Sequence, residues 1–235
     1  DSGTMEMADL SYEEEMAKAS DDFEIELTSQ YDDSFVHYTI DTTGKLRGMV
    51  HRHLAVLQQL ATGKRVLDLS DSDVYWCIAD PGCAEGSFFA MLAPWTNGVT
   101  QFVREGDFET SVFYEAIEKY KVTVWYADPF SLHMLIDEGG NKAEQHDISS
   151  LRHICSRGDG LIPESAEWFS KVFDVILYCI LWQSETGAAL IANYPGLDMR
   201  FGSMGRTMPG IEACIVDENY NPVLPGVVGE LAIRP

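Results

Sequence analysis

The fold is decided by residues 108–137, which run FETSVFYEAIEKYKVTVWYADPFSLHMLID. Apolar side chains in the first part share one face of a helix predicted over Phe108–Tyr120. A β-rich run, Val122–Tyr126, follows directly, and Pro129–Asp137 is again typical of a helix. Because this order predicts a helix, a strand and a helix in sequence, it favours a layered α/β structure.

The same alternation extends outward in both directions. Strands are predicted at Phe35–Thr39, Val74–Ala79, Val99–Val103, Val122–Tyr126, Leu151–Cys155 and Val175–Leu181. Helices are predicted near Val50–Thr62, Gly86–Ala93, Phe108–Tyr120, Pro129–Asp137 and Pro163–Val172. The sequence therefore predicts the α/β class, with a layered sheet flanked by helices and a small all-β segment at the C-terminal end.

Three parts of the chain differ in composition. Residues 1–33 form an acidic lead-in with a weak helix near Tyr12–Ala19 and a β-like run at Phe23–Leu27. Residues 34–197 carry the α/β alternation. Residues 198–235 are predicted to be a small β-rich subdomain, because glycines separate short alternating runs there.

Charge and composition exclude several function classes. The 235 residues are 46% hydrophobic, which is typical of a folded protein, and 38 acidic against 16 basic residues give a net charge of −22. This charge argues against nucleic-acid binding, and it opposes ATP, CoA and anionic membranes unless a local site reverses the field. No apolar run approaches the roughly 20 residues that span a bilayer, and the acidic N-terminus is unlike a secretory signal. We expect no membrane segment.

Cysteine and histidine usage points to the cytoplasm and away from a metal site. The five cysteines contain no C-x-x-C pair, which favours free thiols in a reducing cytosol over disulfides or metal ligation. His51 and His53 could contact one metal ion from a strand, but no third ligand is spaced to complete the site.

The first motif with chemical content is residues 38–51, YTIDTTGKLRGMVH. It predicts a strand, a hydroxyl- and glycine-containing loop and then a helix, an arrangement in which backbone N–H groups can hold phosphates. It is not a Walker loop, because Leu46 follows Lys45 where that motif has Ser or Thr. On the residues alone, a capping turn and a phosphate site both remain open.

The second motif is residues 182–187, WQSETG, which follow the apolar strand directly. Side chains at the carboxyl end of such a strand are placed to meet a ligand, and Glu185 is suited to bind Mg²⁺. The alternative is that Ser184 and Thr186 cap a helix with Glu185 in its first turn.

These two motifs and their surroundings resemble the AMP-forming acyl-CoA synthetases of the acyl-adenylate-forming superfamily, and the acetyl-CoA synthetases most closely. The family's phosphate loop is matched at Tyr38, Thr39, Thr42, Thr43, Gly44, Lys45, Gly48 and His51. Further matches are residues 73–77, 79–82, 93–95, 118–126, 149–152 and 209–212. The match runs from about Tyr12 to Pro235. It corresponds to only part of the chain of a family member, and several of the motifs are degenerate.

The resemblance implies an acid–thiol ligase that uses ATP, Mg²⁺ and CoA, passes through an acyl-adenylate and releases AMP. The implied nucleotide-binding residues are Thr42, Thr43, Gly44, Lys45, Gly158, Asp159, Gln183, Ser184 and Thr186. Glu185 would be the catalytic residue that ligates Mg²⁺. Trp182 matches the indole that limits the acyl pocket to acids such as acetate or propionate.

The departures from the family pattern lie in the motifs. Asp41 replaces a glycine in the phosphate loop, where a carboxylate would repel a phosphate. Glu85 and Arg157 introduce two charges into the implied acyl pocket, and we expect them to pair and fill it, because an unpaired buried charge is costly.

The family's members carry a further N-terminal subdomain and a mobile C-terminal domain that supplies the lysine of adenylation. From the resemblance we expect the AMP-binding core of an acetate–CoA ligase, inactive as these 235 residues alone. The alternative is a non-catalytic module that binds a nucleotide or a partner protein on the same scaffold.

Overall fold

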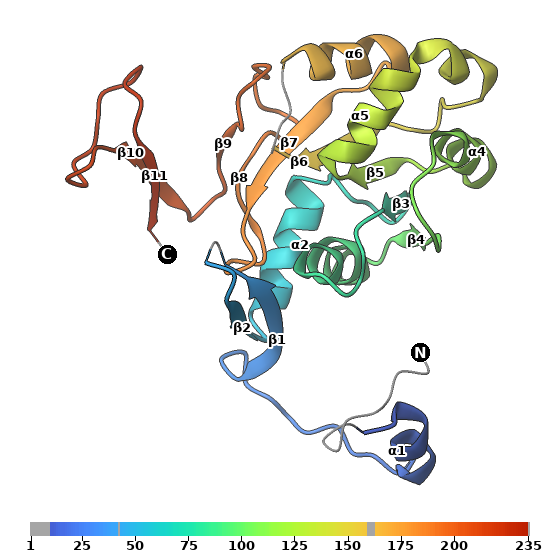
Figure 1. Ribbon diagram of the computed structural model, residues 1–235, viewed down its shortest axis with the longest axis vertical. Helices are drawn as coiled ribbons and strands as arrows, with labels where there is room; N and C mark the ends of the chain where they lie inside the picture. Colours follow the sequence, from blue (N-terminus) through green and yellow to red (C-terminus); the bar gives the residue numbers. More distant parts are fainter. Residues whose placement is uncertain (1–9, 42, 159–162, 235) are drawn as a thin grey trace.

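A seven-stranded sheet organises the computed structural model, which describes residues 10–41, 43–158 and 163–234 (Figure 1). The strand order is β4-β3-β5-β6-β7-β8-β9. These strands are β3 (Val74–Cys77), β4 (Thr100–Phe102), β5 (Val124–Ala127), β6 (His153–Arg157), β7 (Leu177–Trp182), β8 (Ala189–Ala192) and β9 (Arg206–Thr207). Strands β4 to β7 are parallel, and β8 and β9 are added antiparallel. The predicted α/β class is confirmed.

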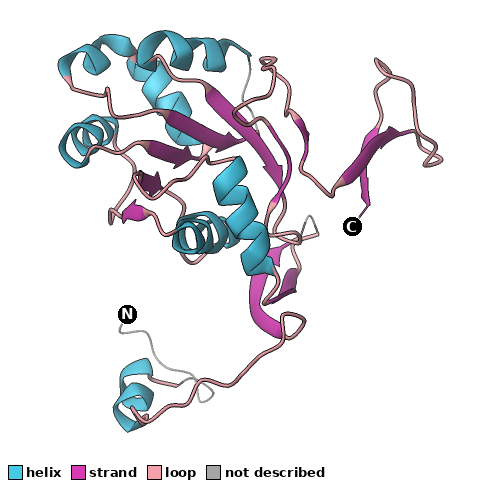
Figure 2. Ribbon diagram, turned by 180° about the vertical axis from the view of Figure 1, so that it is seen from behind, coloured by secondary structure: helices cyan, strands magenta, loops and turns pink. Residues whose placement is uncertain are grey.

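Helices cover both faces of this sheet (Figure 2). They are α2 (Ala55–Arg65), the π-helix η1 (Gly86–Leu92), α3 (Ala93–Asn97), α4 (Thr110–Tyr120), α5 (Pro129–Glu138), the 3₁₀ helix η2 (Gly140–Gln145) and α6 (Pro163–Phe173). A further helix, α1 (Tyr12–Lys18), does not cover the sheet. Local sequence explains where they begin and end. The Asp128 side chain accepts a hydrogen bond from Ser131 N–H at 3.1 Å and so caps α5, while Lys121 adopts a left-handed conformation that ends α4.

The core consists of two apolar clusters, one on each face of the sheet. Strand β5 separates them, because Val124 and Tyr126 point into one cluster and Trp125 and Ala127 into the other. All four residues are fully buried. A strand covered on both faces is uniformly apolar, which is why the run at residues 122–126 was a strong signal.

The structure corrects the prediction for residues 38–51, which form a hairpin and not a strand followed by a helix. Strands β1 (Asp33–Ile40) and β2 (Leu46–Arg52) pair antiparallel, and α2 begins only at Ala55. One face of the hairpin places His37 and His51 on Phe88, with ring centroids 5.3 Å and 5.0 Å apart. This packing on one face of the hairpin stabilises extended strands at residues where a helix was expected.

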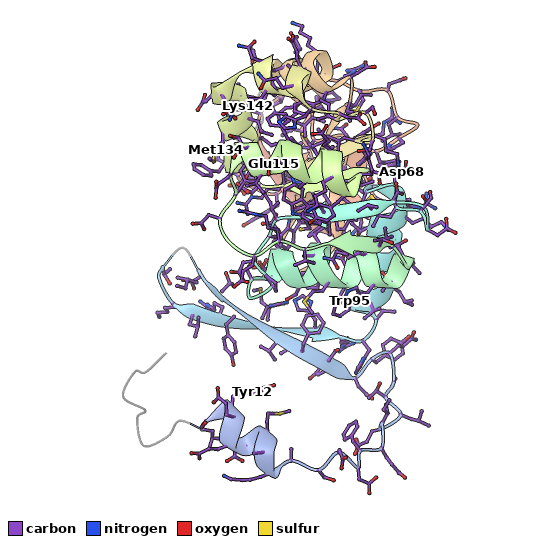
Figure 3. The ribbon with its side chains drawn as sticks, turned by 90° about the vertical axis from the view of Figure 1, so that its right-hand side faces the viewer. Tyr12, Asp68, Trp95, Glu115, Met134 and Lys142 are labelled. Atoms are coloured by element: carbon purple, nitrogen blue, oxygen red, sulfur yellow. The ribbon has the colours of Figure 1, made fainter. Side chains whose placement is uncertain are left out.

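The two ends of the described chain lie away from the main sheet. Helix α1 has no buried residue, and Figure 3 shows Tyr12 on it, apart from the main body. The β-like run predicted at Phe23–Leu27 is wrong, since these residues form no strand. Strands β10 (Glu212–Val216) and β11 (Glu230–Arg234) form a separate hairpin, whereas β9 pairs with β8 of the large sheet. Among the described residues, no helix is long and apolar enough to cross a membrane.

Candidate active site

A cavity of about 780 Å³ opens at the carboxyl ends of β6 and β7, next to the loop that follows β3. Strand β3 lies between β4 and β5. The connection from β3 to β4 therefore runs to one side of β3, and the connection from β4 to β5 crosses to its other side. Ligands of open α/β sheets bind outside the carboxyl ends of the strands near such a reversal. The position of the cavity is therefore the one that this architecture offers to a ligand.

Seven of the predicted site residues line this cavity: Glu85, Arg157, Gly158, Trp182, Gln183, Ser184 and Glu185. They come from the start of η1, the end of β6 and the end of β7 with its following turn. Thr43, Gly44, Lys45 and Thr186 do not line it, and Thr42 and Asp159 lie outside the described residues. The structure thus brings together residues up to about a hundred positions apart in the chain.

Glu85 and Arg157 form the predicted ion pair. Arg157 Nη1 donates to Glu85 Oε2 at 3.2 Å, and the Tyr126 hydroxyl donates to Glu85 Oε1 at 2.8 Å. Burial raises the pKa of Glu85 above its usual value, and Arg157 and Tyr126 oppose this rise by stabilising the carboxylate. The expectation that the pair fills the cavity was wrong, because the two side chains line a space that remains open.

An aromatic wall lies beside the ion pair. The ring centroid of Trp182 is 5.1 Å from that of Phe89 and 6.2 Å from that of Phe88. Phe89 in turn stacks on Tyr126 at 4.7 Å and 7°. The Trp182 side chain is therefore held by residues of η1 and β5, so it forms a fixed boundary of the cavity.

The turn after β7 presents a carboxylate to the cavity. Gln183, Ser184 and Glu185 line it, and Glu185 is exposed and forms no ion pair with any described residue. The helix-capping alternative is wrong, because residues 183–187 form a turn that leads into β8. The Thr186 hydroxyl donates to Gln183 C=O at 3.0 Å, which closes this turn.

His51 of β2 lies near this turn. Burial lowers the pKa of His51, while the backbone of Ser184 and the nearby charge of Glu185 oppose that shift. The described ranges contain no group of three or more His, Cys, Asp or Glu side chains arranged for a metal ion, at His51 and His53 or elsewhere. The five cysteines are free, as predicted, with Cys83 and Cys214 exposed.

The turn between β1 and β2 already holds a carboxylate. Asp41 Oδ1 accepts hydrogen bonds from Thr43 N–H at 2.8 Å, the Thr43 hydroxyl at 2.5 Å and Lys45 N–H at 3.0 Å. Asp41 Oδ2 accepts from Arg47 Nε at 2.8 Å. The Thr43 hydroxyl first, then Arg47 and Lys45 N–H, lower the pKa of Asp41 to about 2. The donors expected to hold phosphates are therefore occupied by the chain's own anion.

Sequence reasoning missed several residues at the cavity. Tyr38 and Thr39 of β1 line it, although both belong to a quoted motif, because the hairpin that brings them there was not predicted. Met204 also lines it, and a Cβ at Gly158 would meet Met204 Sδ at 2.0 Å. Glycine at position 158 therefore permits this close approach.

The cavity residues fit Mg²⁺ that arrives with a phosphate ligand. A Mg²⁺ ion usually takes one or two carboxylates together with substrate phosphates and water. Glu185 offers one exposed carboxylate without a competing partner among the described residues. No resident metal cluster is needed for such a site.

Comparison with known proteins places this geometry in context. A model of the family described as "AMP-binding enzyme" matches residues 1–235. The chain is 42% identical over 225 residues to an acetyl-coenzyme A synthetase of Bacillus subtilis (strain 168), covering 96% of this chain and 39% of the relative. It is 34% identical over 234 residues to an acetyl-coenzyme A synthetase of Alcanivorax borkumensis, covering 96% and 36%.

Solved structures agree. The chain superimposes on the crystal structure of a Brucella canis acyl-CoA synthetase with a TM-score of 0.86 and 29% identity, covering 99% of this chain and 42% of that one. An anthranilate CoA ligase in complex with anthranoyl-AMP shares the fold, with a TM-score of 0.84 and 24% identity over 98% of this chain and 44% of that one. The chain thus spans about two-fifths of the length of these proteins.

Proposed function

This chain belongs to the family of AMP-binding enzymes, and from that premise we propose that it is the nucleotide- and acyl-binding core of an AMP-forming acid–thiol ligase. The observation that carries the proposal is the cavity at the carboxyl ends of β6 and β7, lined by both Trp182 and Glu185. An apolar wall for an acyl group and a carboxylate for a metal-bound phosphate chain face the same space.

The proposed reaction has two steps. A carboxylate oxygen of the acid attacks the α-phosphorus of ATP, the bond to the bridging oxygen of the β-phosphate breaks, and pyrophosphate leaves. The sulfur of CoA then attacks the acyl carbonyl of the adenylate, the carbon–oxygen bond to phosphate breaks, AMP leaves and the thiol proton passes to solvent.

The chain's own residues bind and orient the reactants. Glu185 would ligate Mg²⁺, which neutralises phosphate charge during the first step. Gln183 and Ser184 would contact the nucleotide from the turn after β7, and Gly158 would border the adenine. Trp182 would bound the acyl group. The turn residues Thr43, Gly44 and Lys45 would reach phosphates only if Asp41 releases their backbone N–H groups.

The substrates follow from the same premise. The relatives are named for acetyl-coenzyme A, which supports acetate or propionate as the acid and CoA as the thiol. ATP and CoA as partners support a cytoplasmic role. The charge of −22 argues against nucleic acid and anionic membranes as partners.

A second candidate function is favoured by Asp41. Its carboxylate takes hydrogen bonds from two backbone N–H groups of the phosphate turn, so this turn is satisfied without ATP. A non-catalytic module that binds a nucleotide weakly, or a partner protein, would keep the scaffold with such a turn.

Calorimetric titration of the 235-residue chain with ATP, with and without Mg²⁺, tests the proposal. We expect binding that depends on Mg²⁺ and that Glu185→Gln weakens by about tenfold. The matched control is Glu115→Gln, because Glu115 is an exposed glutamate on α4 (Figure 3) that does not line the cavity. No heat at millimolar ATP, or equal weakening by both variants, would favour the non-catalytic module.

A further inference from the structure

The inner part of the cavity is polar on one side, which acetate does not require. Glu85, Tyr126 and Arg157 form a connected chain of hydrogen bonds there, beside the aromatic wall of Trp182 and Phe89. An acid with only a methyl group would make no hydrogen bond to the guanidinium donors of Arg157 that Glu85 leaves free.

Glu85 has little left to offer a ligand. Its side chain is 11% exposed, and each carboxylate oxygen already accepts a hydrogen bond, from Tyr126 and from Arg157. Its role in the structure is to hold the guanidinium of Arg157 in place.

Arg157 retains free donors. Its side chain is 45% exposed and lines the cavity, and only Nη1 donates to a residue that the structure describes. A guanidinium carries five N–H donors in a fixed planar fork, so Nε and Nη2 can still bind an anion. Carboxylates match this fork in shape and charge better than a hydroxyl or an amide does.

We propose that this cavity selects a short dicarboxylic acid, one carboxylate of which is adenylated while the other binds Arg157. This inference rests on the proposed function, because it names the acid for the same site. The wall formed by Trp182 limits the length of the acid. An acid bearing an ammonium group beside Arg157 is disfavoured, because the guanidinium would repel the cation.

Two adenylate mimics test the choice of acid, namely acetyl- and malonyl-sulfamoyl adenosine, titrated calorimetrically into the 235-residue chain. The readout is the ratio of their dissociation constants, in which any change in nucleotide binding cancels. We expect the malonyl mimic to bind about tenfold more tightly, as one charge-assisted hydrogen-bond pair allows. Arg157→Gln should bring the ratio to about one, and Arg157→Lys should give an intermediate ratio.

One control variant frames the result. Arg104→Gln, at an arginine that pairs with Glu109 and does not line the cavity, should not change the preference for the malonyl mimic. Equal or tighter binding of the acetyl mimic by the unmodified chain would overturn the inference and leave the proposed function standing. Failure of ATP and of both mimics to bind would instead overturn the proposed function, and the inference with it.

Discussion

Two carboxylates of the chain, Asp41 and Glu85, have opposite environments. Asp41 lies in the turn of the β1–β2 hairpin and accepts hydrogen bonds from Thr43, Lys45 and Arg47. Glu85 lies at the start of η1, nearly buried, with Tyr126 and Arg157 as partners. The pKa of Asp41 falls to about 2, whereas the pKa of Glu85 is raised by its burial.

The difference teaches that a residue type does not fix the effect of a substitution. An aspartate surrounded by donors in a solvated turn stabilises its own charge and competes with any other anion for those donors. A glutamate removed from water depends on its partners to stay ionised. We therefore expect Asp41 to affect ligand binding and Glu85 to affect folding, and the following experiments probe that contrast in order of expected effect.

Removing the partner of the buried carboxylate should have the largest effect. Arg157→Val should lower the free energy of unfolding by about 2–3 kcal/mol, below the 3–5 kcal/mol of fully buried pairs because Arg157 is half-exposed. Urea denaturation measures this loss. Arg234→Val is the matched control: it breaks an exposed pair with Glu212 and should cost less than about 0.5 kcal/mol. Equal losses in the two variants would show that burial does not distinguish the pairs.

Removing the second partner of Glu85 should have a smaller effect. Tyr126→Phe deletes the hydroxyl that donates to Glu85 Oε1 and should cost about 1.5 kcal/mol, the usual contribution of a hydrogen bond to a charged group. Tyr120→Phe is the control, since Tyr120 is 46% exposed and its hydroxyl has no hydrogen-bond partner among the described residues. Thermal or urea denaturation gives both values. A loss at position 126 no larger than at position 120 would contradict the bond's role.

Removing the carboxylate from the turn should change binding more than stability. Asp41→Gly frees the N–H groups of Thr43 and Lys45 and removes a negative charge, so ATP should bind about tenfold more tightly, a modest gain because the turn is solvated. Asp41→Asn should gain less, because its amide oxygen can still accept from those N–H groups. Calorimetry with ATP and Mg²⁺ measures both. Unchanged or weaker binding in both variants would mean that the turn does not meet phosphates.

The pH dependence of stability should have opposite signs at the two sites. The pKa of Glu85 is raised in the folded state. The stability that Glu85 contributes, relative to Glu85→Gln, is therefore fully present below about pH 4.5 and is lost as the pH rises. The pKa of Asp41 is lowered from 3.8 to about 2, so the stability that Asp41 contributes, relative to Asp41→Asn, is present above pH 3.8 and is lost as the pH falls toward 2. Unfolding free energies at a series of pH values would reveal slopes of the same sign if the contrast is wrong.

The sheet was largely predictable because its strands are buried on both faces. The run at residues 175–181 is apolar throughout and falls on β7, and the run at residues 122–126 is apolar apart from Thr123 and falls on β5. The hairpin was not predictable in the same way. Strand β2 has only one buried residue, His51, so its alternation is weak, and its pairing is fixed by contacts with Phe88 of η1.

The site was predictable where residues follow strands and not where distant elements meet. Arg157 and Glu185 lie at or after the ends of β6 and β7, where ligands of such sheets bind. Two contacts at the site depend on packing between elements that are far apart in the chain. They are the hydrogen bond from the Tyr126 hydroxyl to Glu85 and the close approach of Met204 to Gly158. No local pattern in the sequence reports such contacts.

The contrast between the two carboxylates is tested most directly by NMR titration of their side-chain carboxyl ¹³C signals, assigned with Asp41→Asn and Glu85→Gln. We expect Asp41 to titrate with a pKa of about 2 and Glu85 to titrate above its usual value of 4.5. A pKa below 4.5 for Glu85, or a pKa near 3.8 for Asp41, would contradict the account. Either result would mean that burial and the hydrogen-bond donors of the turn do not shift the two pKa values in opposite directions.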